Sequence, residues 1–227
     1  MTQAAKSQEM WTAVDDFFSN LLAPADPALE EALRTTAAAD MPPINVSAMH
    51  GKLLQILARL LGARNILEIG TLGAYSTIWM ARALPAEGQV ITLEADAKHA
   101  EVARKNIAFA GLGDKIDLRF GPALETLPKI AAEQLPPFDL CFIDANKSQM
   151  PEYFSWCLKL TRPGGIIVAD NVVRSGAVIE KNSTDADVRG VRRFLEMVAK
   201  EPRVSATALQ TVNNKGYDGF ALLFVNE

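Results

Sequence analysis

The sequence predicts an α/β fold in which a mostly parallel sheet is covered by helices on both faces and ends in an antiparallel hairpin. From residue 65 onward, short apolar runs alternate with helical patterns. The first five runs carry apolar residues that would face both sides of a sheet, as in strands of a parallel sheet whose two faces are buried. The last two runs are joined by a short, turn-rich segment, which is typical of a hairpin.

Residues 1–61 are predicted to form a helical N-terminal extension. Apolar side chains recur there at three- and four-residue spacing, first at Trp11, Val14, Phe17, Phe18 and Leu21, then at Val46, Met49, Leu53, Leu54 and Leu57. The motif MPP at 41–43 interrupts the helices, because proline removes a backbone donor and restricts its predecessor. We expect the extension to cover the core at 62–227 or to form a subunit contact, within a single domain spanning 1–227.

The five buried strands each end in a glycine, an acid or a turn. They are NILEIG at 65–70, QVITLE at 89–94, KIDLRF at 115–120, FDLCFI at 138–143 and GIIVAD at 165–170. Helical patterns lie between them at 75–83, 98–110, 124–131 and 153–160, and another covers 188–200. The final runs, 204–212 and 220–225, flank the segment NNKGYDG and complete a seven-stranded sheet.

Composition and charge narrow the classes of function. A net charge of -4 and a pI near 5.3 give no general attraction to nucleic acid or to anionic membranes. Cys141 and Cys157 are too few for a disulfide framework and are predicted to be free thiols. The chain has no recognisable signal peptide, and no apolar run approaches the roughly 20 residues of a membrane helix. We therefore expect a soluble, cytoplasmic protein with no membrane partner.

A glycine-containing loop, EIGTLGAYS at 68–76, connects the first strand to a helix. Glycines at such a turn let the backbone approach a ligand closely, at the strand ends where open α/β sheets bind ligands. Leu72 stands where a dinucleotide-binding loop needs its second glycine, and Glu68 would repel a pyrophosphate. An NAD(P) oxidoreductase is therefore disfavoured, whereas the acid suits a zwitterionic methionine tail.

Glu94 ends the second strand, where a carboxylate can accept hydrogen bonds from both hydroxyls of a ribose. Together with Glu68, Gly70 and Ser76 it favours an adenosyl cofactor over an ordinary glycine turn with two surface acids. The triplet GPA at 121–123 follows the third strand and leaves room for an adenine, but a plain turn explains it almost as well.

Two carboxylates and an amide stand at the ends of the fourth and fifth strands. Neighbouring parallel strands would place Asp144 beside Asp170 and Asn171 at one edge of the sheet. This oxygen-only set suits Mg²⁺ first, or Mn²⁺ or Ca²⁺, and disfavours Zn²⁺. Capping residues or a solvated acidic rim are the alternative, since acids at strand ends are common.

Lys147 lies three residues after Asp144, beside this set. A lysine near a dication is disfavoured as ammonium, and the amine is then suited to accept a proton from a phenol. Without the neighbouring acids, a surface lysine at the start of a helix would be the preferred interpretation. His50 and His99 are predicted to be surface or helix-end residues, and Trp79 and Trp156 to pack on the sheet.

These motifs resemble the metal-dependent O-methyltransferases that include the caffeoyl-CoA and catechol enzymes, in their bacterial small-molecule branch. The resemblance covers nearly the whole chain and rests on MPPINVSAMHGKLL, LEIGTLGAYS, Glu94, FDLCFIDANK, GGIIVADNVVRSG and YDGFALLFV. It implies a Rossmann-like class I methyltransferase fold, S-adenosyl-L-methionine as cofactor and a divalent metal. A homodimer is expected from the family and from the apolar N-terminal helices.

By that resemblance Asp144, Asp170 and Asn171 bind the metal, and Lys147 acts as the base beside Asp144. The implied cofactor site comprises Met41, Val46, Glu68, Gly70, Thr71, Tyr75, Ser76, Glu94, Ala95, Ala123, Asp144 and Asn146. Met41 would border the transferred methyl group. Asn146 and Pro122 depart from the acids that relatives often carry. Arg174-Ser175 replaces a substrate-contacting asparagine of the plant enzymes, so their acyl-thioester substrate does not carry over.

The predicted reaction is methyl transfer to one hydroxyl of a vicinal diol such as a catechol, with both oxygens chelating the metal and Lys147 removing the proton. One alternative is an O-methyltransferase acting on hydroxyuridine in tRNA, which needs a basic patch. Arg189, Arg192 and Arg193 form the one dense cluster of basic residues, and an exposed helical face explains them equally well. A non-catalytic protein that binds S-adenosylmethionine is the other alternative, but it would be expected to lose Lys147 or a metal ligand.

Overall fold

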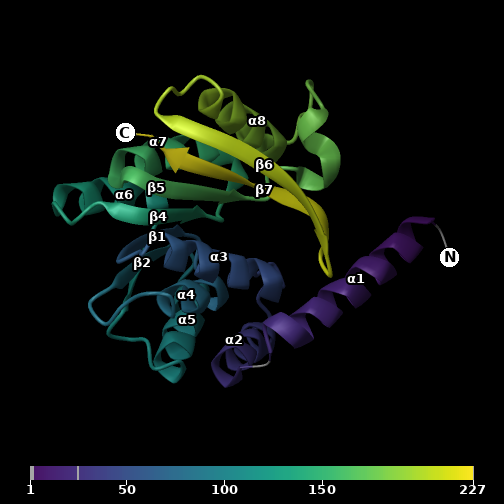
Figure 1. Ribbon diagram of the computed structural model, residues 1–227, viewed down its shortest axis with the longest axis horizontal. Helices are drawn as coiled ribbons and strands as arrows, with labels where there is room; N and C mark the ends of the chain where they lie inside the picture. The colour runs from purple at the N-terminus through teal and green to yellow at the C-terminus, as the bar shows by residue number, and fades with distance from the viewer. Residues whose placement is uncertain (1–2, 25, 227) are drawn as a thin grey trace.

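A computed structural model describes residues 3–24 and 26–226 and contains a seven-stranded sheet in the order β3-β2-β1-β4-β5-β7-β6 (Figure 1). The strands are β1 Asn65–Ile69, β2 Gln89–Glu94, β3 Ile116–Phe120, β4 Phe138–Ile143, β5 Thr161–Asp170, β6 Val204–Asn213 and β7 Gly216–Val225. β1 to β5 pair in parallel, and β7 runs antiparallel to both β5 and β6. The predicted Rossmann-like sheet with its C-terminal hairpin is confirmed.

The hairpin strands are longer than predicted. Pairing begins at Asn213 and Gly216, so that only Asn214 and Lys215 form the turn. Most of the polar segment NNKGYDG is therefore strand, because its glycines and Tyr217 can pair with β6 at the exposed edge of the sheet. β5 likewise begins at Thr161, ahead of its apolar run.

The helices lie close to the predicted positions. They are α1 Gln3–Leu22, α2 Pro27–Ala38, α3 Ala48–Leu60, α4 Tyr75–Ala81, α5 Ala97–Phe109, α6 Ala123–Ala132, α7 Met150–Leu160 and α8 Ala186–Val198, with short 3₁₀ segments η1 Lys147–Gln149 and η2 Arg174–Ile179. Side chains of Asp26, Ser47, Asp96 and Asp185 accept backbone N–H groups at the helix starts that follow them. These N-caps satisfy donors that the first helical turn leaves unpaired.

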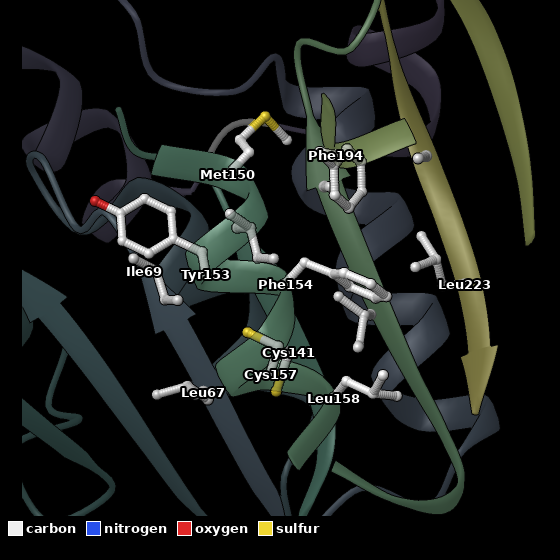
Figure 2. Close-up of a cluster of buried hydrophobic side chains, with 14 of the residues drawn as sticks. Leu67, Ile69, Cys141, Met150, Tyr153, Phe154, Cys157, Leu158, Phe194 and Leu223 are labelled. Atoms are coloured by element: carbon white, nitrogen blue, oxygen red, sulfur yellow. The ribbon is translucent and has the colours of Figure 1, made fainter. Parts of the chain in front are cut away.

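Two hydrophobic clusters lie on opposite faces of the sheet. Alternate strand residues point to opposite sides, so Leu67 and Ile69 join one cluster whereas Ile66 joins the other. Figure 2 shows the first cluster, in which α7 residues such as Phe154 and Leu158 pack with Phe194 of α8 and Leu223 of β7. Helices α2 to α5 cover the second cluster. Helices on both faces of the sheet are thus confirmed.

The N-terminal helices differ in how they meet the core. Leu54 and Ala58 of α3 belong to the second cluster, so α3 is part of the covering layer. α1 instead projects from the body of the molecule (Figure 1), and it reaches the hairpin through Gln8 and Asp15. None of the described helices combines the length and apolar character needed to cross a membrane.

Candidate functional site

A cavity of about 560 Å³ opens at the carboxyl ends of the strands, within the size range of small-molecule sites. Twelve of the residues singled out from the sequence line it: Val46, Gly70, Thr71, Tyr75, Ser76, Glu94, Ala95, Ala123, Asp144, Asn146, Lys147 and Asn171. Residues at or just after the ends of β1, β2, β4 and β5 meet there because parallel strands end at the same edge. The predicted adenosyl loop and the predicted metal ligands therefore share one cavity.

Gly70 brings these two parts into direct contact. Its φ of +102° lies in a region that favours glycine, and an added Cβ would lie 2.1 Å from the carbonyl oxygen of Asp144. The backbone N–H of Asp144 donates to the carbonyl of Ile69 at 2.9 Å. The end of β4 thus lies against the start of the glycine-containing loop with no room for a side chain at position 70.

Glu94 organises the loop that follows Gly70. Its Oε2 accepts the backbone N–H of Leu72 at 2.8 Å, and its Oε1 accepts that of Asp96 at 2.9 Å. Leu72 has a φ of +50°, so the residue that replaces the dinucleotide-type glycine adopts a left-handed conformation held by this carboxylate. Each oxygen of Glu94 keeps a second lone pair, and the side chain lines the cavity, as an acceptor for ribose hydroxyls requires.

Glu68 does not line the cavity. Its side chain is completely buried under α4, where it accepts the hydroxyls of Ser76 at 2.5 Å, Thr77 at 2.5 Å and Thr92 at 2.6 Å. Alternation along β1 explains this position, because Glu68 points to the same face as Ile66. In this structure Glu68 reaches the cavity only through Ser76, which lines it.

The predicted metal ligands stand at the ends of the neighbouring strands β4 and β5. Asp144 and Asn171 line the cavity, whereas Asp170 is buried and does not. Burial, and then the charge of Asp144, raise the pKa of Asp170 to about 7. Two carboxylates this close are costly without a cation, and carboxylate and amide oxygens are the ligands that Mg²⁺ or Ca²⁺ prefers. The residues present therefore fit a hard divalent metal.

The predicted metal site contains two carboxylates and one amide, those of Asp144, Asp170 and Asn171. No group of three or more His, Cys, Asp or Glu side chains that could hold a metal occurs among the described residues. Such a sparse set would leave coordination positions for other oxygen ligands.

Lys147 is almost completely buried at the start of η1. Its Nζ donates to Oδ1 of Asp144 at 2.7 Å. Gly190 of α8 makes this placement possible, because a Cβ there would lie 2.2 Å from the carbonyl oxygen of Lys147. The lysine amine and Asp144, a predicted metal ligand, are thus held together facing the cavity.

Met41 is buried and does not line the cavity. Both histidines lie in the first turn of a helix, one of the two positions predicted for them. His50 is not a surface residue: its ring stacks on Phe220 with centroids 5.1 Å apart, and its Nδ1 lies 3.6 Å from Oδ2 of Asp170. Burial lowers the pKa of His50 to about 4, so the imidazole is neutral at pH 7. His99 lines the cavity beside Glu94.

The sequence held a signal for His50 that was missed. The histidine lies four residues before Leu54, on the apolar face of α3 that packs on the sheet. A further contact could not be read from the sequence: Nζ of Lys215, in the hairpin turn, donates to the carbonyl oxygens of Pro43 and Asn45. Asn45 lines the cavity, so the hairpin tip holds one of its walls.

The sheet is Rossmann-like, its second strand ends in Glu94, and a glycine-containing loop follows its first strand. Together these features define a class I methyltransferase that uses S-adenosylmethionine. The family model described as O-methyltransferase matches residues 20–222. The chain belongs to this family and is an S-adenosylmethionine-dependent O-methyltransferase.

Relatives of known name are similar over nearly their whole length. A catechol O-methyltransferase of Niastella koreensis is 52% identical, with 96% of this chain and 99% of the relative covered. A catechol O-methyltransferase of Mycobacterium tuberculosis is 50% identical, with 93% and 94% covered.

Solved structures agree with this assignment. The O-methyltransferase of Bacillus cereus in complex with SAH is 56% identical, with 96% of this chain and 100% of that chain covered and a TM-score of 0.95. The O-methyltransferase TomG of Streptomyces achromogenes in complex with SAM is 49% identical, with both chains fully covered and a TM-score of 0.95.

The buried Glu68 predicts a pH-dependent stability. Burial raises its pKa to about 7 from 4.5, against three hydroxyl donors that lower it. Between these values the folded chain binds more protons than the unfolded chain, so Glu68 costs stability as pH rises from 4.5 to 7. Relative to Glu68→Gln, the wild type should lose about 3 kcal/mol of unfolding free energy between pH 4.5 and 8, measured by urea denaturation.

The exposed acid Glu125 on α6 provides the control, since Glu125→Gln should show no such pH-dependent difference from wild type. If the difference between wild type and Glu68→Gln stays constant over this range, the three hydroxyls keep Glu68 ionised and the expectation is wrong.

Proposed function

We propose that this enzyme is a divalent-metal-dependent O-methyltransferase that methylates one hydroxyl of a catechol-like phenolic diol. The observation that carries the proposal is the contact between Lys147 and Asp144, 2.7 Å apart, in the cavity that also holds Asn171 and the glycine-containing loop. Relatives named catechol O-methyltransferase at 50% identity and above support it.

Asp144, Asp170 and Asn171 would hold the metal. Oδ1 of Asp144 accepts from Lys147, which leaves Oδ2 of the same carboxylate for the metal. A divalent cation bound there, Mg²⁺ in the first place and Mn²⁺ or Ca²⁺ as alternatives, would polarise the two oxygens of a vicinal diol and favour their deprotonated form.

The chain's own residues perform the remaining steps. Glu94 and the loop at 70–76 bind and orient the methyl donor, S-adenosylmethionine. The acceptor oxygen forms a bond to the methyl carbon while the carbon–sulfur bond of the sulfonium breaks. Nζ of Lys147 takes the proton of the reacting hydroxyl. Asp144 holds that amine in place and stabilises the ammonium that results.

Metal dependence and diol selectivity can be tested together with methyl-labelled S-adenosylmethionine. We expect labelling of catechols and caffeate esters with Mg²⁺, loss of labelling with EDTA, and none with monophenols. Asp144→Ala should abolish the metal-dependent labelling, whereas the exposed-residue control Asp114→Ala should not. Equal labelling with EDTA, or of monophenols, would contradict the proposal.

Lys147→Met should lower kcat by about 10²- to 10⁴-fold, the usual contribution of a general base. A nitrocatechol, whose hydroxyl is already largely ionised at neutral pH, should recover much of this loss because it needs no base. The exposed Lys129→Met is the control. The same loss with both acceptors would show that Lys147 does not act as the base.

The alternative acceptor, a hydroxyuridine in RNA, would need a basic patch on the surface of the protein. Arg192 donates to the carbonyl of Val178, and Arg193 donates to that of Ser148. Two of the three clustered arginines are therefore engaged with the protein's own backbone. A small molecule is the favoured acceptor.

We also propose that the enzyme is a homodimer through α1. The apolar residues Met10, Val14, Phe17, Phe18, Leu21 and Leu22 form one exposed stripe along this helix. Asp15, by contrast, is turned inward and accepts the backbone N–H of Asn214. α1 projects from the body of the molecule (Figure 1). An exposed apolar stripe on such a helix is typical of a surface that another protein covers, and a second copy of this chain is the partner present in any purified sample.

Sedimentation velocity at micromolar concentration should give a dimer for the wild type. The double variant Phe17→Glu with Leu21→Glu should sediment as a monomer, because it places charges in the apolar contact. Asn20→Glu, also exposed on α1 but outside the stripe, should remain a dimer. A monomeric wild type would overturn this proposal.

A further inference from the structure

The loop that follows the metal ligands has an unfavourable backbone conformation. Arg174 and Ser175 have φ values of 54° and 53°, and Gly176 follows with 93°. Two successive residues with a Cβ in the left-handed region are unusual and persist only where the surroundings hold them. The methyltransferase reaction described above uses none of these residues.

One carboxylate holds this loop. Oδ1 of Asp218, on β7, accepts the backbone N–H groups of Val173 and Arg174 at 3.0 Å each, and that of Gly219 at 2.9 Å. Gly219 is itself in close contact, because a Cβ there would meet the carbonyl oxygen of Leu209. The anchor fixes where the backbone of Arg174 lies and leaves its side chain to other contacts.

The side chain of Arg174 lines the cavity together with Lys147 and Asn171. It is the one arginine among the described residues that line the cavity. Its Nη2 lies 3.4 Å from Oδ2 of Asp187, a long contact for an ion pair, and its buried Nε has no hydrogen-bond partner. A guanidinium with an unpaired buried donor and a weak counter-ion is incompletely satisfied.

We propose that Arg174 binds a carboxylate on the methyl acceptor, so that the preferred acceptors are catechols bearing an acid group. This inference rests on the proposed diol methylation. A planar guanidinium suits a carboxylate because it can donate two parallel hydrogen bonds. Glu94, Asp144 and Asp187 already line the cavity, so a singly charged acid is a better ligand than a doubly charged phosphate. Asp187 competes with the acceptor for the same cation.

A matched pair of acceptors separates this role from general catalysis. 3,4-Dihydroxycinnamate and its methyl ester carry the same diol and differ in the acid group. In the wild type, kcat/KM should be higher for the acid than for the ester. Arg174→Gln should lower this acid-to-ester ratio by about 10- to 100-fold, as expected for the loss of charge-assisted hydrogen bonds, chiefly through KM of the acid.

Two further variants define the contact. Arg174→Lys keeps the charge but not the two parallel donors, so the ratio should recover only in part. Asp187→Asn removes the competing carboxylate and should raise the ratio several-fold. Arg189→Gln, an exposed arginine on the same helix as Asp187, is the matched control and should leave the ratio unchanged.

The failure of this proposal can be distinguished from failure of the proposed function. If Arg174→Gln weakens both acceptors equally, or if the wild type prefers the ester, Arg174 does not bind an acceptor carboxylate. If neither diol is methylated, the proposed function fails. In that case calorimetry should be used to measure the Kd values of the acid and the ester with Mg²⁺ and SAH present. Equal Kd values in the wild type would show that Arg174 does not bind the carboxylate.

Discussion

The site depends on a close approach between two backbones that a single side-chain atom would prevent. Gly70 lies against the carbonyl of Asp144, where a Cβ would be 2.1 Å from the oxygen. The glycine-containing loop and the strand end that carries the acids are therefore built as one unit. If the proposed donor and acceptor sites lie on either side of this contact, the two substrates would be held within reach of one another, which converts a collision into an oriented reaction.

Burial gives the acids of this region different tasks. Glu94 faces the cavity and holds the loop through two backbone amides. Glu68, completely buried, acts as an internal acceptor for three hydroxyls. Burial and the charge of Asp144 raise the pKa of Asp170, and a cation bound there would relieve this repulsion. Similar acids thus stabilise a loop, stabilise a helix start and form the proposed metal site, because solvent and neighbouring charges differ at each position.

The sequence predicted the sheet and most of the cavity because both follow from where strands end. Asp144, Asn171 and Glu94 stand at those ends, and the parallel pairing brings them together. What the sequence could not supply are side-chain directions and distant contacts. Strand alternation turns Glu68 beneath α4, so that it reaches the cavity only through Ser76. His50 required knowledge of how α3 packs, and Lys215 meets Asn45 across 170 residues of sequence. The conformation of the loop at 174–176 follows from Asp218, 44 residues later.

The anchor of that loop acts only on backbone groups. The three hydrogen bonds that Asp218 accepts come from backbone N–H groups, those of Val173, Arg174 and Gly219. Residues 174 and 175 can therefore be exchanged without releasing the backbone, provided that they tolerate positive φ. Because Arg174 lines the cavity, the residue at this position can change what the cavity binds while Asp144, Lys147 and Asn171, which follow β4 and β5, stay unaltered.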